Sequence, residues 1–157
     1  MNHSKTHYLT FFLLFIAFIA MSFNALESKK TSVAEAIQSG EWIVYETINN
    51  VTISYKVVDC TDEVNGLFTQ DLFLKVENKN TKDVQVTFNT ALWVNDQMTH
   101  DGTSEESKVS LKIAAGQTIA GDCKENPQLK IFIGFNDEDK LNIPHTSHFE
   151  LKDINVK

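Results

Sequence analysis

The chain has 157 residues, with 14 basic and 21 acidic side chains and a net charge of −7. Every basic residue is a lysine. Arginine is the usual bidentate partner of phosphate and guanine, so an acidic chain without arginine is a poor candidate for binding nucleic acid or an anionic membrane surface.

The N-terminus has the pattern of a secretory signal peptide. A short polar stretch carrying Lys5 precedes an apolar run at residues 11–23. That run falls within the ~7–15 residues of a signal core and is shorter than the ~20 that span a bilayer. The small residues of Ala20-Met21-Ser22 predict a signal peptide at residues 1–22 and a mature chain that begins at Phe23 or Leu26, exported to the periplasm, the cell surface or the medium. The alternative is an uncleaved anchor, which would be the chain's only contact with a membrane.

Residues 23–40 differ in character from the rest and are expected to form a linker or a short helix. Ser32-Val33-Ala34-Glu35 has the form of a capping box, and Gly40 would suit a helix end. These signals predict one to two helical turns from Val33 to Gln38, too short to be stable alone. The segment is therefore either a linker or a small lid docked on the domain.

Residues 41–157 alternate between apolar and polar positions, which is typical of strands with one buried face. Asn49-Asn50 is a tight-turn signal between two such segments, and a change of phase at Asp153 indicates a β-bulge in the last one. About 130 residues after the signal are enough for one domain, and the short strands predict an antiparallel β-sandwich. The expected strands are 42–48, 51–57, 72–76, 84–94, 109–113, 118–120, 129–135 and 149–156.

Cys60 and Cys123 are the chain's two cysteines. An even number in an exported chain favours a disulfide, and two cysteines allow one pairing. Closing a loop of about 63 residues would stabilise the fold by roughly 4 kcal/mol in the chain-entropy model. Both cysteines are expected in loops, and neither has the neighbours of a catalytic thiol.

Three segments resemble units of immunoglobulin-like and fibronectin-like sandwiches. Leu72–Asn78 followed by Val84–Phe88 is similar to their strand, asparagine-containing turn and strand, and Val109–Gly121 is similar to a later hairpin. Together with the signal, the chain resembles the small exported β-sandwich proteins of Gram-negative bacteria that have no assigned activity. The resemblance covers roughly residues 41–157 and implies an all-β immunoglobulin-like sandwich of seven to eight strands.

The chain departs from antibody-type domains at their most specific positions. Trp93 lies about midway between the two cysteines rather than shortly after the first, and Cys123 follows Ala120-Gly121-Asp122 instead of an Asp-x-Tyr-x sequence. The inter-sheet disulfide of those domains is therefore not implied for this chain.

No recognisable catalytic or phosphate-binding motif is present, and no cofactor or metal is expected. His145 and His148 are three residues apart, so on an extended segment they point to opposite faces and are interpreted as loop histidines. Acidic loops at Asp59–Glu63, Asp101–Glu106 and Asp137–Asp139 carry the oxygens that calcium prefers. None matches an EF-hand loop, and we interpret them as solubilising charge.

Three aromatic residues have the opposite parity from the core positions of their strands. If the registers hold, Phe73, Trp93 and Phe132 lie on outer faces and form one apolar patch that binds a ligand. The alternative is that the rings are packed, either because a bulge near Asn89-Thr90 turns Trp93 inward or because Val33–Ile37 covers them.

These observations favour an exported, non-enzymatic binding or interaction module whose partner is a protein or a glycan. One alternative is a structural envelope or matrix component that assembles through a sheet edge. Another is a small hydrolase, which is disfavoured because no nucleophile and base can be paired.

Overall fold

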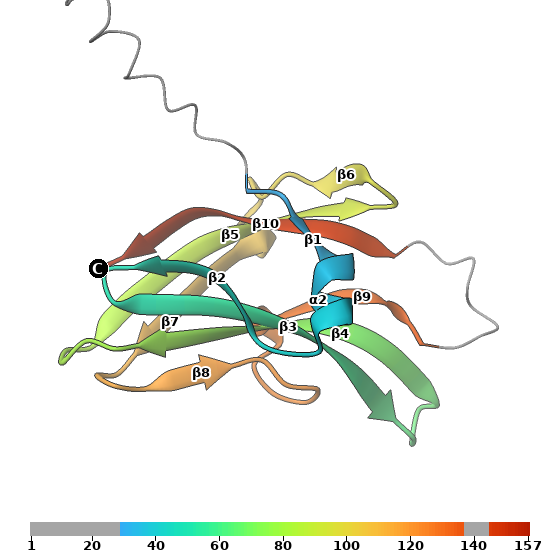
Figure 1. Cartoon of the computed structure of the whole chain (residues 1–157), viewed down its shortest axis with the longest axis horizontal. Coiled ribbons are helices and arrows are strands. Elements are labelled where there is room, and N and C mark those ends of the chain that lie inside the picture. The colour runs from blue at the N-terminus through green and yellow to red at the C-terminus, as the bar shows by residue number, and fades with distance from the viewer. Residues whose placement is uncertain (1–28, 137–144) are drawn as a thin grey trace, which may run out of the picture.

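The computed structural model describes residues 29–136 and 145–157. The predicted signal peptide at residues 1–22, and with it the start of the mature chain, lies outside the described residues. Within them the chain forms ten strands, one α-helix and two short 3-10 helices (Figure 1). The elements are β1 (Thr31–Ser32), α2 (Val33–Ser39), β2 (Ile43–Ile48), β3 (Val51–Asp62), β4 (Leu67–Asn78), β5 (Val84–Val94), β6 (Gln97–His100), η1 (Glu105–Ser107), β7 (Lys108–Ile113), β8 (Thr118–Ala120), η2 (Pro127–Leu129), β9 (Lys130–Phe135) and β10 (Thr146–Val156).

The strands form two antiparallel sheets that pack as a sandwich, which confirms the predicted fold class. The first sheet has the order β1-β10-β5-β6, with β7 also paired to β5, and the second has the order β2-β3-β4-β8, with β9 also paired to β4. All eight expected strands are present. Immunoglobulin constant-type domains place their second and third strands in different sheets. Here β2, β3 and β4 are neighbours in one sheet, so the likeness to that family is one of architecture and not of strand order.

Two hairpins turn on pairs of residues with positive φ. Asn49 and Asn50 have φ of 48° and 60° between β2 and β3, as the turn signal predicts. Asn95 and Asp96 have φ of 48° and 64° and lead into β6, a strand missing from the sequence prediction. All four residues of β6 are exposed, so it has no buried face that an apolar alternation would mark.

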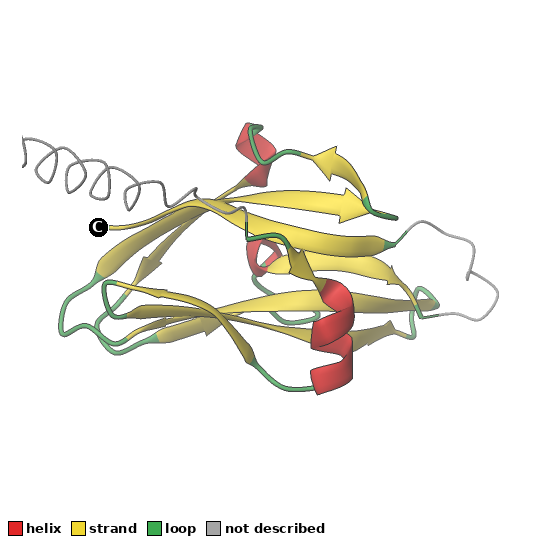
Figure 2. Ribbon diagram, turned by 45° about the horizontal axis from the view of Figure 1, so that its top comes forward, coloured by secondary structure: helices red, strands yellow, loops and turns green. Residues whose placement is uncertain are grey.

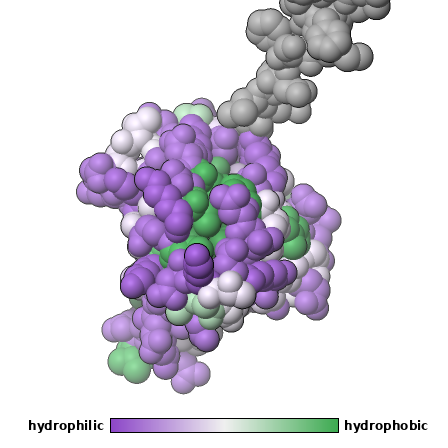
Figure 3. Space-filling model, turned by 90° about the vertical axis from the view of Figure 1, so that its left-hand side faces the viewer, coloured by the Kyte–Doolittle hydropathy of each residue, from purple (hydrophilic) through white to green (hydrophobic). Residues whose placement is uncertain are grey.

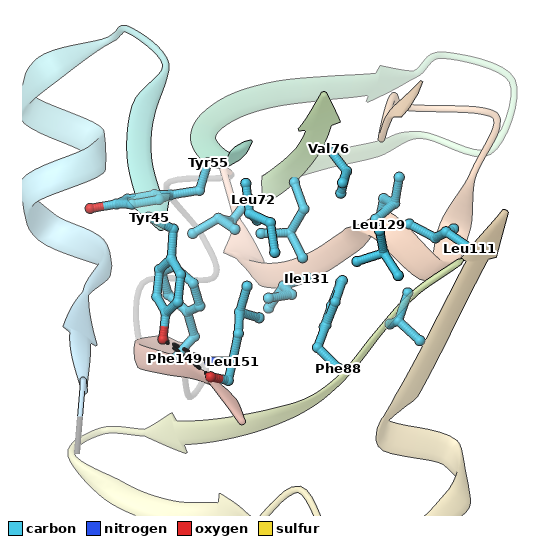
Figure 4. Packing of buried hydrophobic residues seen from close by; sticks show 14 of the residues in the cluster. Tyr45, Tyr55, Leu72, Val76, Phe88, Leu111, Leu129, Ile131, Phe149 and Leu151 are labelled. Atoms are coloured by element: carbon cyan, nitrogen blue, oxygen red, sulfur yellow. Dashed lines mark hydrogen bonds between the residues drawn. The ribbon is translucent and has the colours of Figure 1, made fainter. Parts of the chain in front are cut away.

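The core lies between the inner faces of the two sheets (Figure 4). At one side of it, the Tyr55 and Phe149 rings meet edge to face with centroids 5.2 Å apart, and Tyr45 packs against Phe149 at 5.7 Å. The Tyr45 hydroxyl accepts a hydrogen bond of 3.0 Å from the backbone N–H of Leu151 on β10. This bond joins β2 to β10, which belong to opposite sheets.

Helix α2 closes the same side of the sandwich, because it contacts both β3 and β10 (Figure 2). Its residues Val33 and Ala36 are buried in the core. The helix ends as predicted, since Gly40 has a φ of 62° and its N–H donates to the Ala36 carbonyl at 3.3 Å. The expected capping box is wrong, because the Ser32 side chain makes no capping hydrogen bond.

The predicted bulge in the last strand is confirmed. Asp153 has a φ of 53°, and the register of β10 against β5 shifts between Lys152 and Asn155. The extra residue restores the inward direction of Ile154 and Val156, which pack partly buried against the core.

Cys60 and Cys123 form the expected disulfide. Cys60 lies in β3 and not in a loop, because the β3–β4 hairpin extends to the turn after Asp62.

No helix of the described residues is long and apolar enough to cross a membrane. The end of the molecule near the C-terminus is mostly hydrophilic, with apolar side chains in a central strip (Figure 3).

Candidate functional site

The three predicted aromatic residues do not form one patch. Phe73 lies opposite Lys56 and Lys130 in the second sheet, and Phe132 lies opposite Asp71 in the same sheet. Trp93 belongs to the first sheet, with the core between it and the other two rings. The prediction of a single exposed patch is therefore wrong, since the parity of each strand does not say which sheet it joins.

Trp93 faces outward but is covered. The preceding residue in β5, Leu92, pairs with the core residue Phe149, so Trp93 lies on the other face of the sheet. The register is continuous at Asn89 and Thr90, and no bulge turns the ring inward. Trp93 is nevertheless only 8% exposed, with the Lys30 ammonium 5.1 Å from its ring centroid.

Phe132 is the one accessible ring of the three. Phe73 is 5% exposed, whereas Phe132 is 43% exposed and meets Phe135 edge to face with centroids 5.2 Å apart. A role in binding therefore stays a prediction for Phe132, and burial argues against such a role for Phe73 and Trp93.

The inner face of β5 is covered along only half of its length. Val84, Val86 and Phe88 are buried in the core, as their parity predicts. Thr90, Leu92 and Val94 continue the same face but are only partly buried. The second sheet does not cover this half of β5, and an apolar groove opens between the sheets.

The loop after β6 packs on the opposite face of β5, which explains why the groove stays open. Gly102 is buried there, and a Cβ added to it would lie 3.5 Å from the Ala91 backbone nitrogen. The Lys152 ammonium donates to the Asp101 carbonyl at 2.9 Å and holds the loop in place. The loop therefore buries the outer side chains of β5 and leaves the inner ones accessible.

The groove has a volume of about 480 Å³, within the ~300–1,000 Å³ typical of ligand pockets. Its floor is apolar and its rim is polar. The lining residues are Thr90, Leu92, Val94, Thr99, His100, Ser104, Glu106, Ser107, Lys108, Val109, Pro127, Gln128, Lys130, Ile131, Phe132 and Thr146.

The two lysines among these residues are only loosely paired, and Lys130 lies on the outer face of the second sheet, opposite to Ile131. The Lys108 ammonium lies 3.8 Å from the Glu105 carboxylate, which is almost fully exposed. The Lys130 ammonium lies 4.0 Å from the buried Asp71 carboxylate, which also accepts a 2.8 Å hydrogen bond from the Thr69 hydroxyl. Charge-assisted hydrogen bonds are typically about 2.7–2.9 Å long, so both ammonium groups keep donors for another acceptor.

Two of the acidic loops use a carboxylate to organise their own backbone. Hydrogen bonds from the Thr103 N–H and hydroxyl hold the pKa of Asp101 below its usual value. Hydrogen bonds from the side-chain amide and N–H of Asn65 lower the pKa of Asp62 in the same way. The third loop, Asp137–Asp139, lies outside the described residues.

A serine, a histidine and an aspartate meet where β10 begins. The His148 Nδ1 lies 3.0 Å from the Asp96 carboxylate and 3.2 Å from the Ser147 hydroxyl. A catalytic relay needs serine and carboxylate on different ring nitrogens, whereas here both approach Nδ1. The Ser147 hydroxyl also accepts from the Asp96 N–H at 2.9 Å, so the cluster ties β10 to the turn before β6.

The sheet edges give little support to assembly by strand addition. In the described part of the chain, the edge strands β1, β6 and β8 have two to four residues. The registers of β2 and β9 shift at a bulge or irregularity, as does that of β10. Edge strand β7 carries Lys108 and Lys112. Short strands, bulges and lysines are the features that keep edges from pairing with another chain.

Comparison with known proteins does not assign a family. The chain matches no family model, and no curated protein matches it in sequence. It is similar to the crystal structure of a DUF1425 family member from Shewanella sp. pv-4, with a TM-score of 0.37 and 12% identity, over 76% of this chain and 90% of that chain. A likeness at this level carries no conclusion about family or function.

Proposed function

We propose that the chain is an exported, non-enzymatic binding module and that its ligand lies in the groove between the sheets. The observation that supports the proposal is the only partly buried inner face formed by Thr90, Leu92 and Val94. Apolar side chains that face the interior of a sandwich are normally covered, and an accessible apolar pocket with a polar rim is the usual form of a ligand site.

Export is part of the proposal. The disulfide between Cys60 and Cys123 fits an oxidising compartment such as the periplasm or the outside of the cell. N-terminal sequencing of the protein from its host tests this part. A chain that begins at Phe23 or Leu26 supports export, and an intact Met1 in the cytoplasmic fraction contradicts it.

Filling the groove tests the binding site. Val94→Phe places a larger side chain in the groove, and Val44→Phe is the matched control, because Val44 is 61% exposed on β2 and does not line the groove. Wild type and both variants are screened against protein, glycan and small-molecule arrays. We expect ligands that bind wild type and the control but not Val94→Phe. If every ligand tolerates Val94→Phe, the groove is not the binding site.

A further inference from the structure

We propose that Met98 is an oxidation site, at which a peroxide converts the thioether to a sulfoxide, and that the sulfoxide loosens strand β6 from Trp93. The inference goes beyond the proposed binding function and is independent of the groove, since Met98 does not line it. It depends on the exposure of Met98, on its position opposite Trp93, and on the composition of β6.

Met98 offers an accessible sulfur. Its side chain is 52% exposed and lines a surface cavity beside β10. The chain has three methionines, and Met98 is the only one in a mature chain that begins at Phe23. Both cysteines are in the disulfide, so no free thiol reacts first. Because the oxidation of sulfur follows its exposure, a small oxidant in solution would react at this residue.

The reaction needs only a peroxide as co-reactant. The Met98 sulfur attacks one oxygen of hydrogen peroxide, a sulfur–oxygen bond forms, and the oxygen–oxygen bond breaks. The other oxygen leaves as water and takes both protons of the peroxide. The sulfur is oxidised, because it gives up an electron pair, and the peroxide is reduced. A polar sulfoxide then replaces a flexible apolar side chain.

Met98 holds β6 against the outer face of the first sheet. It is a cross-strand partner of Trp93, which places the two side chains on the same face with Cβ atoms about 5 Å apart. Trp93 faces outward but is only 8% exposed. Met98 is the one apolar residue of β6, and all four residues of this strand are exposed. Contacts between a thioether and an aromatic ring are favourable, so a sulfoxide weakens the main apolar contact of the strand.

The backbone contacts around β6 do not involve the sulfur, so the effect of oxidation is local. The Thr99 hydroxyl donates to the Leu92 carbonyl at 3.4 Å, and the Lys152 ammonium donates to the Asp101 carbonyl at 2.9 Å. Both bonds remain available after oxidation. We therefore expect β6 to open more often while the rest of the sandwich stays folded.

The experiment treats the disulfide-bonded mature chain with dilute hydrogen peroxide and follows it by peptide mass mapping and NMR. We expect one added oxygen, at Met98, at a rate within about fivefold of that of N-acetylmethionine amide, since the side chain is half exposed. The indole N–H resonance of Trp93 should shift, and amide hydrogen exchange across residues 97–100 should become faster. The resonance of Trp42, whose ring lies beneath Lys75 of the second sheet, should not move.

Two variants separate the loss of the apolar contact from other effects of the oxidant. Met98→Leu keeps an apolar side chain and has no sulfur, so peroxide should change neither the Trp93 resonance nor the exchange of β6. Met98→Gln places a polar side chain of similar length in the same position. It should reproduce the faster exchange of β6 and the shift of Trp93 without any oxidant.

Either of two results would overturn the inference. If peroxide oxidises N-acetylmethionine amide and leaves Met98 intact, the side chain is protected in solution and the site does not exist. If Met98 gains an oxygen while the Trp93 resonance and the exchange of β6 stay as in the untreated chain, the sulfoxide does not loosen the strand. Neither result bears on the proposed groove, which is tested separately with Val94→Phe.

Discussion

The two sides of this sandwich differ in how the gap between the sheets is closed. On one side, helix α2 bridges β3 and β10, and the rings of Tyr45, Tyr55 and Phe149 fill the space beneath it. On the other side, β9 approaches the second half of β5 without a helix or a large ring between them, and a groove of about 480 Å³ remains. The closed side thus has a helix of seven residues that the open side lacks.

Phe149 and Leu92 show how burial differs between two adjacent strands of the first sheet. They are cross-strand partners on the same inner face of the first sheet. Phe149 on β10 is fully buried, whereas Leu92 on β5 is only partly buried. Position on the inner face is therefore not sufficient for burial, because the opposing sheet must also reach that position.

The largest expected effect comes from truncating each member of this pair. Phe149→Ala should lower the free energy of unfolding by about 3–5 kcal/mol, since it leaves a cavity beneath α2. Leu92→Ala should lower it by about 1–2 kcal/mol, because part of the side chain already contacts water. Urea unfolding of both variants measures the contrast. Equal losses would mean that the groove is closed in solution.

Reducing the disulfide should have the next largest effect on stability, and it acts on the open side. Cys123 begins the segment that leads to η2, and Pro127 and Gln128 of that helix line the groove. Cross-links of this loop length typically stabilise by about 2–4 kcal/mol. Urea unfolding with and without reductant measures the loss, and Cys60→Ser/Cys123→Ser serves as a control for side reactions. An unchanged midpoint, or two alkylated thiols in protein taken from its host, would contradict the stabilising role.

The amino-acid sequence predicts the closed side better than the open one. Each core strand has a strict alternation, the Asn49-Asn50 turn has its own signal, and the phase change at Asp153 marks a real bulge. The position of α2 follows from Val33 and Gly40. These features are local, so the residues that cause them are close together in the chain.

The groove depends on contacts that are distant in the chain. Leu92 and Val94 have core parity and are indistinguishable from Phe88 by pattern, and nothing in the sequence places Val109 and Ile131 along the same groove. Strand β6 has no apolar alternation, so the loop that it directs over the outer face of β5 could not be placed. The same loop lies over the outer face where Trp93 was expected to be exposed.

Removing the Tyr45 hydroxyl tests the hydrogen bond between β2 and β10 on the side that α2 closes. Tyr45→Phe leaves the buried N–H of Leu151 without its 3.0 Å acceptor and should cost about 1–3 kcal/mol. Tyr55→Phe is the matched control, because the Tyr55 hydroxyl makes no hydrogen bond to the described residues, and it should cost less. If the two variants unfold at the same urea concentration, the Tyr45 bond does not stabilise this side.

The same tyrosine predicts how stability depends on alkaline pH. Burial raises the pKa of Tyr45 above its ordinary value of about 10, and the hydrogen bond with Leu151 offsets part of the shift. The folded state then holds its proton more tightly than the unfolded state, so stability is complete below about pH 10 and falls as pH rises through the raised pKa. Tyr45→Phe should lose less stability than wild type over this range. An equal loss would assign the alkaline transition to other groups, of which Tyr55, whose pKa is also raised by burial, is the first to test.

The smallest expected effect on stability is at Phe132, the exposed ring of the open side. Phe132→Ala should cost about 1 kcal/mol or less, since the ring is 43% exposed and its edge-to-face contact with Phe135 is its main packing interaction. Phe68→Ala is the matched control, because Phe68 is 44% exposed and does not line the groove. Both variants should melt close to wild type. A loss above about 3 kcal/mol for Phe132→Ala is the cost of a core ring, and it would show that the ring is covered in solution.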